Sequence, residues 1–319
     1  IVSTQPSWFY VMVVVTVLLL TELKHTFTEF AQRMKNDEMI TLAKFLAISG
    51  IILPMLPHKN LIPDINLTPY SIWLATVVVS GISYLSYLLK RYVFHESGTL
   101  VSGIIGGLYS STATISVLAR KSRKASEQEA TDYVAAMLLA VSMMFLRFMI
   151  LILIFSREIF LSIYPYLLTM AVVAAIVAWF IHSRQKRPED QSAETEEDDS
   201  SNPLEFKVAL IFAVLFVIFT FLTHYTLVYA GTGGLNLLSF VSGFSDITPF
   251  ILNLLQNTGS VAALIITACS MQAIISNIMV NMFYALFFAG KGSKLRPWIL
   301  GGFGVVIVCN LVLLLFFYI

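Results

Sequence analysis

Two short runs of glycine, serine and threonine interrupt otherwise apolar stretches of this sequence. The first reads SGIIGGLYSSTATISVLARKS over Ser102–Ser122, and the second reads SFVSGFSDITPFILNLLQNTG over Ser239–Gly259. In each run, glycines precede hydroxyl-bearing residues, and an apolar helix follows. Glycine permits non-helical backbone, and Ser, Thr or Asp can cap the helix that begins next. Backbone carbonyls freed at such a point, together with side-chain hydroxyls, can replace the water around a dehydrated cation.

Polar residues on the apolar segments that follow would complete such a site. Arg147 and Asp246 are the leading candidates, because an ionisable side chain deep in a membrane is costly and marks function. A structural ion pair between them, or an Arg147 side chain reaching the interface, is the competing interpretation. The predicted substrate- or ion-binding residues are Ser110, Ser111, Thr112, Thr114, Ser142, Arg147, Ser245, Asp246, Thr248, Gln272, Ser276 and Asn277.

The chemistry of these residues leaves two substrate classes open. Oxygen-only ligation suits a hard cation, with predicted ligands at Asp246, Ser110, Ser111 and Thr248, and the candidate coupling or transported ions are sodium, a proton and magnesium. Arg147 instead suits an anionic substrate carried with a coupling cation. The competing interpretation of both runs is packing, since small residues are common between membrane helices. Gln272, Asn277 and Asn281 share a helical face, where they line a pathway or bond one helix to another.

The rest of the chain has the composition of a membrane protein. Apolar residues make up 57% of its 319 residues and charged residues 12%, against about a quarter in soluble domains. The net charge of +1 predicts no nucleic-acid partner. No nucleotide-binding glycine loop and no histidine–carboxylate constellation is present, so we predict no enzymatic activity, no cofactor and no ATP-driven pumping. The ten apolar segments are Trp8–Thr21, Ile40–Leu56, Tyr70–Leu89, Gly98–Leu118, Tyr133–Phe155, Ile159–Phe180, Phe206–Ala230, Gly234–Leu255, Val261–Ala289 and Pro297–Ile319.

The distribution of Lys and Arg selects among the topologies of these segments. If all ten cross the membrane and the loop holding Lys24, Arg33 and Lys35 is cytoplasmic, the clusters Arg120–Lys124 and Arg184–Arg187 both fall outside, against the positive-inside rule. If Gly98–Leu118 enters and leaves on one side, both clusters become cytoplasmic, and if Gly234–Leu255 is also re-entrant, Lys291, Lys294 and Arg296 become cytoplasmic too. We therefore predict an all-α integral membrane protein with about eight full transmembrane helices and two re-entrant or broken helical elements. The competing solution is that both segments are full but broken helices.

Under this topology each half contains a crossing, a re-entrant element and two further crossings, in opposite orientations. Such inverted repeats are the architecture of many secondary transporters. The prediction rests on topology and element order, because residue identity between the halves is weak. The predicted parts are N-terminal helices with an interfacial helix (1–69), a first repeat (70–182), a disordered acidic linker (183–204) and a second repeat (205–319). We expect Ile1–Ser7 to come from the interior of a longer chain.

Three stretches, LAKFLAISGIILPMLP, SGISYLSYLLKR and GGLYSSTATISVLARKS, resemble a bacterial membrane domain of unknown function that is associated with MgtC-type domains. The resemblance covers roughly Thr21–Ile319, and GG-x-x-SSTAT with the following LAR is its most specific part. It implies a multi-pass protein of the bacterial inner membrane, a link to magnesium physiology, and an MgtC-type domain or another membrane protein as partner. The Ser-Ser-Thr run is also similar to motifs of sodium-coupled divalent-anion symporters and potassium-efflux antiporters. The second run departs from these with Ser-Asp-Ile-Thr, so an identical sodium site is not implied.

The function predicted from these observations is a secondary transporter of a small ion or solute, coupled to an ion gradient and able to form a homodimer. Its site would lie between the two interrupted elements near the membrane midplane. One alternative is an ion channel built from the same elements, which channel-like conductance would distinguish. Another is a non-transporting regulator or scaffold of the MgtC type, in which Asp246→Asn would leave solute movement unchanged.

Overall fold

The structure, a computed structural model, describes residues 13–18, 21, 24, 36–62, 65, 67–94, 98–123, 125, 127–184, 206–256, 262–290 and 294–318. The chain divides into two compact units, Ile1–Ile51 and Ile52–Ile319. Helix α2 begins at Asn36 in the first unit and ends at Met55, within the residues of the second. The expected interfacial helix and the acidic linker fall largely outside the described residues.

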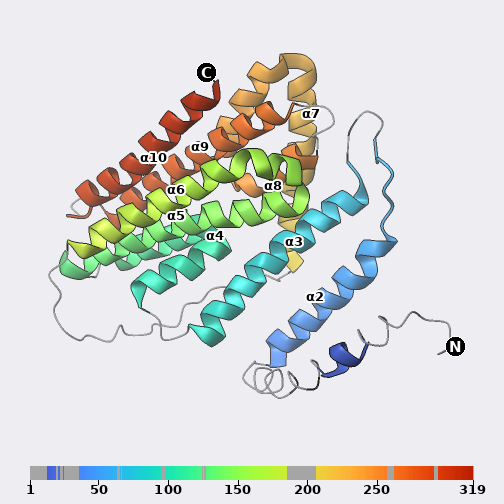
Figure 1. The fold of residues 1–319 in the computed structure, drawn as a ribbon, viewed down its shortest axis with the longest axis horizontal. Helices are drawn as coiled ribbons and strands as arrows, with labels where there is room; N and C mark the ends of the chain where they lie inside the picture. Colours follow the sequence, from blue (N-terminus) through green and yellow to red (C-terminus); the bar gives the residue numbers. More distant parts are fainter. Residues whose placement is uncertain are drawn as a thin grey trace. The chain divides into compact units, whose positions relative to one another are not determined.

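The second unit consists of helices (Figure 1). Its first helix begins with a reciprocal cap, in which the Thr68 and Ser71 side chains each accept a hydrogen bond from the other residue's backbone N–H. The elements are α3 (Pro69–Leu88) with a π-helical turn η2 (Leu89–Val93), α4 (Thr99–Lys121), α5 (Glu127–Phe155), α6 (Arg157–Ser183), α7 (Phe206–Ser242), α8 (Ile247–Gln256), α9 (Ala263–Ala289) and α10 (Arg296–Tyr318).

By length and composition alone, and with α4 counted across its interruption, eight helices among the described residues could cross a membrane. They are α2, α3 with η2, α4, α5, α6, α7, α9 and α10. Helix α8 has 10 residues, which at about 1.5 Å per residue covers about half of the hydrocarbon core. These helices confirm the prediction of an all-α, multi-pass membrane protein.

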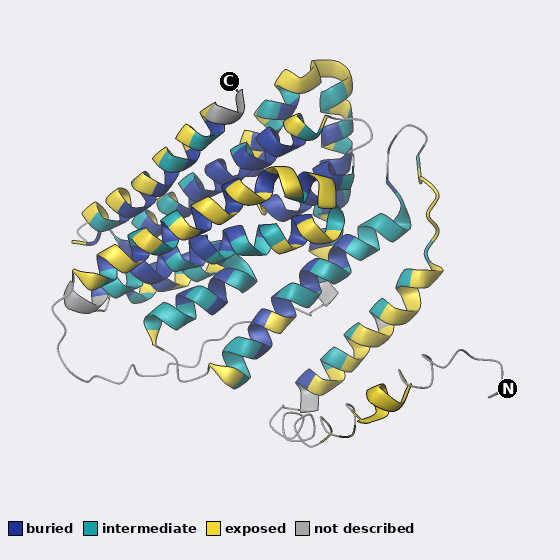
Figure 2. Cartoon of the chain, in the orientation of Figure 1, coloured by how far each residue is buried: buried dark blue, intermediate teal, exposed yellow. Residues whose placement is uncertain are grey.

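The core of the second unit lies along α5, α8 and α9, where buried positions concentrate (Figure 2). Helix α9 is the most enclosed span, with 72% of its most apolar window buried. The peripheral helices instead expose large apolar side chains, such as Trp179 on α6 and Leu315 on α10. Such surfaces are suited to lipid, because hydrocarbon does not penalise exposed apolar groups. The long central helices are therefore the ones able to hold polar groups away from the bilayer.

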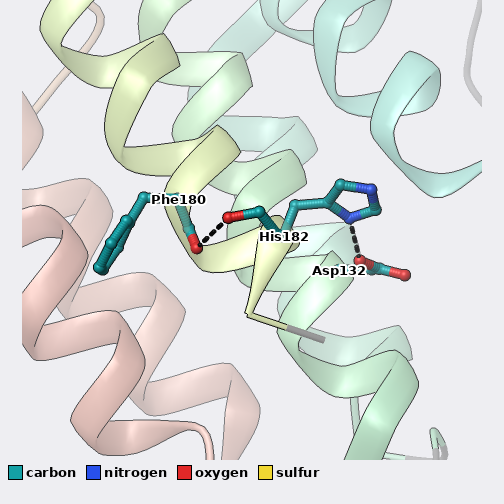
Figure 3. A network of polar contacts seen from close by, with 4 residues as sticks. Asp132, Phe180 and His182 are labelled. Atoms are coloured by element: carbon teal, nitrogen blue, oxygen red, sulfur yellow. Dashed lines mark hydrogen bonds and ion pairs between the residues drawn. The ribbon is translucent and has the colours of Figure 1, made fainter. Parts of the chain in front are cut away.

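Three polar contacts fix α6 against its neighbours. At its C-terminal end, His182 Nδ1 lies 2.6 Å from Asp132 Oδ1 on α5 (Figure 3). Near its middle, the Ser142 hydroxyl of α5 donates to the Ala171 carbonyl at 2.7 Å. On its other side, the Tyr166 hydroxyl hydrogen-bonds the side chain of Asn310 on α10. These contacts join α5, α6 and α10 into one frame.

Arg123, in the connection between α4 and α5, binds the C-terminal end of α9. Its Nη2 donates to the Phe287 carbonyl at 3.2 Å and its Nε to the Phe288 carbonyl, while the Arg120 guanidinium lies 4.4 Å from the Phe288 ring centroid. A cation is favourable there because the last carbonyls of a helix have no partner within the helix and carry partial negative charge.

We expect Arg123→Ala to lower the free energy of unfolding by about 1 kcal/mol, a value reduced because Arg123 is exposed. Thermal unfolding of the purified protein in detergent, followed by tryptophan fluorescence, measures the change. Arg157→Ala removes another exposed arginine, at the start of α6, and should leave the midpoint within experimental error. Equal midpoints for the two variants would show that the contact with α9 does not stabilise the fold.

Candidate functional site

Helix α4 is interrupted at Ser110, whose backbone is extended with φ −159° and ψ 106°. The Ser110 hydroxyl accepts a hydrogen bond from the Ala113 N–H at 3.4 Å, as a cap for the residues that follow. A Cβ added to Gly106 would lie 2.5 Å from Thr114 Oγ1. In a continuous helix these two positions would be separated by about 12 Å along the axis. Residues 99–109 and 111–121 therefore form two arms that fold back on each other.

A second interruption lies between α7 and α8. Helix α7 first turns at Gly231, where φ is +60° and ψ −152°, a conformation that requires glycine. A Cβ added to Gly234 would lie 2.8 Å from Thr226 Cγ2, so residues 206–230 and 232–242 fold back on each other (Figure 1). Residues 243–246 are then non-helical, and α8 begins beyond them. Asp246 Oδ1 accepts the Thr248 N–H at 2.9 Å and caps α8.

Both interruptions rest against the middle of the long helix that follows. On α4, an added Cβ at Gly107 would lie 2.5 Å from Ala140 Cα of α5. At the second interruption, an added Cβ at Gly243 would lie 2.3 Å from Ser276 Cβ of α9. Glycine is therefore required at both points by the close approach of another helix, and not only by backbone flexibility.

The two contacts are spaced identically along the chain. Gly107 and Ala140 are 33 positions apart, as are Gly243 and Ser276. The Ser239 hydroxyl and the Gln272 side chain hydrogen-bond at 2.7 Å across the same separation of 33. The two halves are offset by a constant number of residues. Helix α5 begins at 127 and α9 at 263, which is 136 positions later, and Gly107 and Gly243 are also 136 positions apart. Adding 136 to the position of the capping residue Ser110 gives the position of the capping residue Asp246.

Each interruption frees a backbone carbonyl, and a polar side chain from the following helix binds it. The Tyr109 carbonyl accepts a hydrogen bond from Arg147 Nη1 of α5 at 2.7 Å. The Gly243 carbonyl accepts one from Asn277 Nδ2 of α9 at 3.2 Å. Asn281 Nδ2 donates in turn to Asn277 Oδ1 at 3.1 Å. A released carbonyl in a membrane protein needs such a partner, because hydrocarbon offers none.

Arg147 connects the two interruptions electrostatically. Its guanidinium binds the Tyr109 carbonyl of the first interruption, and the charge of Asp246 at the second acts on it. Arg147 is half-buried, and its Nε is fully enclosed without a hydrogen-bond partner. Asp246 is exposed, and one oxygen of its carboxylate accepts the hydrogen bond from the Thr248 N–H at the start of α8. The structure thus places the two ionisable residues that the sequence singled out within electrostatic range of each other, without an ion pair between these two described residues.

The predicted hydroxyl-bearing residues of the interruptions lie in different surroundings. Ser111 and Thr248 are buried near the start of the second arm of α4 and of α8. Thr112 is half-buried, and its carbonyl accepts the Ser116 hydroxyl, whereas Thr114 lies between the arms of α4. The exposed Ser245 donates to the Ser242 carbonyl at 3.1 Å. Their predicted roles as ligands stay predictions.

The predicted side chains on the long helices mainly bond one helix to another. The Ser276 hydroxyl donates to the Phe240 carbonyl at 2.7 Å, and Gln272 accepts from Ser239. Ser142, whose hydroxyl is bound to the carbonyl of Ala171 on α6, does not reach the interruptions. Within the described ranges, no group of three or more His, Cys, Asp or Glu side chains could hold a metal ion.

Sequence reasoning missed the Tyr109 carbonyl as the partner of Arg147. The available signal was its position immediately before the interrupted helix, where a carbonyl loses its intrahelical donor. It also missed the fixed register of the two runs. Aligned without gaps, Gly-Leu-Tyr-Ser-Ser-Thr from 107 and Gly-Phe-Ser-Asp-Ile-Thr from 243 share glycine, an apolar residue, a capping residue and threonine at matching places.

Comparison with known proteins gives a family but no activity. A family model described as a domain of unknown function (DUF4010) matches residues 77–289. An uncharacterized protein of Aquifex aeolicus (strain VF5) is 25% identical over 227 residues, which cover 69% of this chain and 96% of that protein. No solved structure matches the chain. A family of unknown function agrees with the resemblance seen in the sequence, whereas the association with MgtC-type domains stays a prediction.

Proposed function

We propose that this chain, which belongs to the DUF4010 family of unknown function, is a secondary transporter of a small ion or solute. The observation that carries the proposal is a pair of matching non-helical interruptions, of which Arg147 binds the first and feels the charge of Asp246 at the second. Irregular backbone at membrane depth is tolerated only where protein buries it or where it lines a cavity. Discontinuous helices meeting in this way form the substrate sites of many secondary transporters.

The lengths of the arms support a site near the membrane midplane. Each arm of α4 has 11 residues, residues 232–242 number the same, and α8 has 10. At about 1.5 Å per residue, an arm is about 15–17 Å long and reaches roughly halfway through a 30 Å core. The contacts of Gly107 with Ala140 and of Gly243 with Ser276, in the middle of α5 and α9, fit the same depth. Both elements are therefore re-entrant hairpins in the proposed topology.

The order of the elements supports an inverted repeat. Helix α3, the α4 hairpin, α5 and α6 correspond to residues 206–230, the hairpin of residues 232–256, α9 and α10. Contacts between the halves are reciprocal, because α4 touches α9 while α8 touches α5, and α6 touches α9 while α10 touches α5. With both hairpins re-entrant, each half crosses the membrane three times. An odd number of crossings places the second half in the opposite orientation, as alternating access by inverted repeats requires.

The exposure of Asp246 supports an aqueous path to the site. A carboxylate is costly in contact with hydrocarbon, so an exposed one at this depth must face water. The Nε of Arg147, on which the charge of Asp246 acts, is by contrast enclosed by protein. The arrangement is that expected for a site open to solution on one side and closed on the other.

The test is charge movement in proteoliposomes on a solid-supported membrane, after concentration jumps of sodium, protons, magnesium and sodium salts of small anions. We expect transient currents from one of these jumps, and a decrease of about tenfold or more with Asp246→Ala, because hydrogen bonds to charged groups stabilise by about 1.5–3 kcal/mol. Glu158→Ala, which removes an exposed carboxylate at the start of α6, is the matched control and should retain the current.

Three outcomes of this measurement contradict the proposal. Steady single-channel conductance would identify a channel. Currents unchanged by Asp246→Ala would place the site elsewhere. The absence of current for every jump, from protein that is folded and oriented in the vesicles, would favour a regulator or scaffold over a transporter.

A further inference from the structure

We infer that the site between the two interruptions binds a small oxyanion, a carboxylate-, sulfate- or phosphate-like group, through Arg147. The inference rests on the proposed transport function and specifies its substrate class. It begins from an unused donor, because Arg147 Nη1 donates to the Tyr109 carbonyl while Nε is enclosed without a partner. An enclosed charged donor left without an acceptor is costly, so a small movement that admits a ligand oxygen to Nε would be favoured.

The geometry of the guanidinium favours an oxyanion over a single-atom anion. Arg presents its N–H groups as a rigid planar fork that matches two oxygens of a carboxylate or phosphate. The bond to the Tyr109 carbonyl engages Nη1, which lies away from the edge formed by Nε and Nη2. That contact therefore orients the plane of Arg147 and leaves Nε without an acceptor.

Two helix beginnings add to the positive potential at this point. The second arm of α4 begins after Ser110, and α8 begins after Asp246. Each cap binds one first-turn N–H, that of Ala113 and that of Thr248, and leaves other first-turn N–H groups without an intrahelical acceptor. The beginning of a helix carries about half a positive charge, which supports an anion bound beside the arginine.

The same residues are a poor environment for a divalent cation. Arg147 would repel it, and Asp246 is the carboxylate whose charge reaches that arginine. One oxygen of that carboxylate is already engaged by the Thr248 N–H. Within the described part of the chain, no cluster of three acidic, histidine or cysteine side chains supplies further ligands. Asp246, which lies within electrostatic range of Arg147, is better suited to bind a coupling monovalent cation when the anion is present.

Thermal unfolding of the full chain in detergent tests the inference, with sodium sulfate, phosphate, acetate and succinate compared against sodium chloride at equal ionic strength. Sulfate and phosphate stabilise proteins without binding a site, so only a shift that saturates at low millimolar concentration counts. We expect one anion to give such a shift in the wild type. Arg147→Gln should weaken the apparent affinity about 10- to 100-fold, and Arg147→Lys by a smaller factor, because lysine keeps the charge but loses the fork.

The matched control is Arg157→Gln, which removes an exposed guanidinium at the start of α6 and should bind the anion as the wild type does. If Arg147→Gln does not fold, Arg147→Lys alone decides, since an unchanged affinity would overturn the inference. A saturable shift given by magnesium chloride and abolished by Asp246→Asn would overturn the anion class but leave transport intact. No saturable shift from any of the four anions would also overturn it, while the current measurement decides the transport function separately.

Discussion

Replacing Gly107 by valine is expected to destabilise the protein by about 3 kcal/mol or more. A Cβ at this position would lie 2.5 Å from Ala140 Cα and 2.7 Å from the Ala140 carbonyl oxygen, both backbone atoms of α5. Overpacking a core costs about 1–3 kcal/mol when side chains can move aside, and here a helix backbone would have to move. The measurement is thermal unfolding in detergent, together with the yield of monodisperse protein in gel filtration.

Gly301→Val on α10 is the matched control, because a Cβ at Gly301 meets nothing within 4 Å. We expect this variant to change the free energy of unfolding by at most about 0.5 kcal/mol. If both valine variants unfold at the wild-type temperature, the first hairpin does not pack against α5. The proposed depth of the interruption at Ser110 would then lose its support.

Arg147→Ala is expected to be the most destabilising change of a single charged residue, at about 2–4 kcal/mol. It removes the hydrogen bond from the guanidinium to the Tyr109 carbonyl and the positive charge on which Asp246 acts. A hydrogen bond to a charged group contributes about 1.5–3 kcal/mol, and the charge of the exposed Asp246 carboxylate adds a smaller part. Denaturation midpoints of the purified variants measure the loss.

A double-mutant cycle separates the electrostatic part of this loss from the hydrogen bond. Combining Arg147→Gln with Asp246→Asn removes both charges, and we expect the double variant to be about 0.5–2 kcal/mol more stable than the sum of the single changes predicts. Additive effects would show that the two interruptions do not interact through these side chains. In that case Arg147 would serve only to bind the Tyr109 carbonyl.

The local features of the fold could be predicted from the sequence. The glycines and hydroxyl-bearing residues at 106–112 and 243–248 indicated two interruptions, and the structure confirms that the backbone leaves the helix at Ser110 and between α7 and α8. Capping by Ser110 and Asp246 follows from local chemistry, because each side chain bonds an N–H two or three positions ahead.

The partners of distant residues could not be predicted in the same way. Ser142 appeared to belong to the site because it lies on the same helix as Arg147, but its hydroxyl bonds α6. Which face of α5 meets α4 depends on the packing of small residues such as Ala136 and Ala140, and hydropathy does not distinguish faces in a helix apolar all round. The partner of Arg147, a main-chain carbonyl, has no sequence signature of its own.

Contacting positions are separated by 33 residues in both halves. The number of residues between a hairpin and the helix that supports it is therefore fixed by the packing. Inserting one residue in α5 between Ala136 and Ala140 would rotate the two parts of the helix by about 100° relative to each other, so that Ala136 could not meet Gly103 while Ala140 meets Gly107. Changes of length are therefore tolerable in the connections between helices, such as the one between α6 and α7, and not between a hairpin and its supporting helix. Tags and reporter domains should accordingly be inserted between residues 184 and 206, where the two halves are joined.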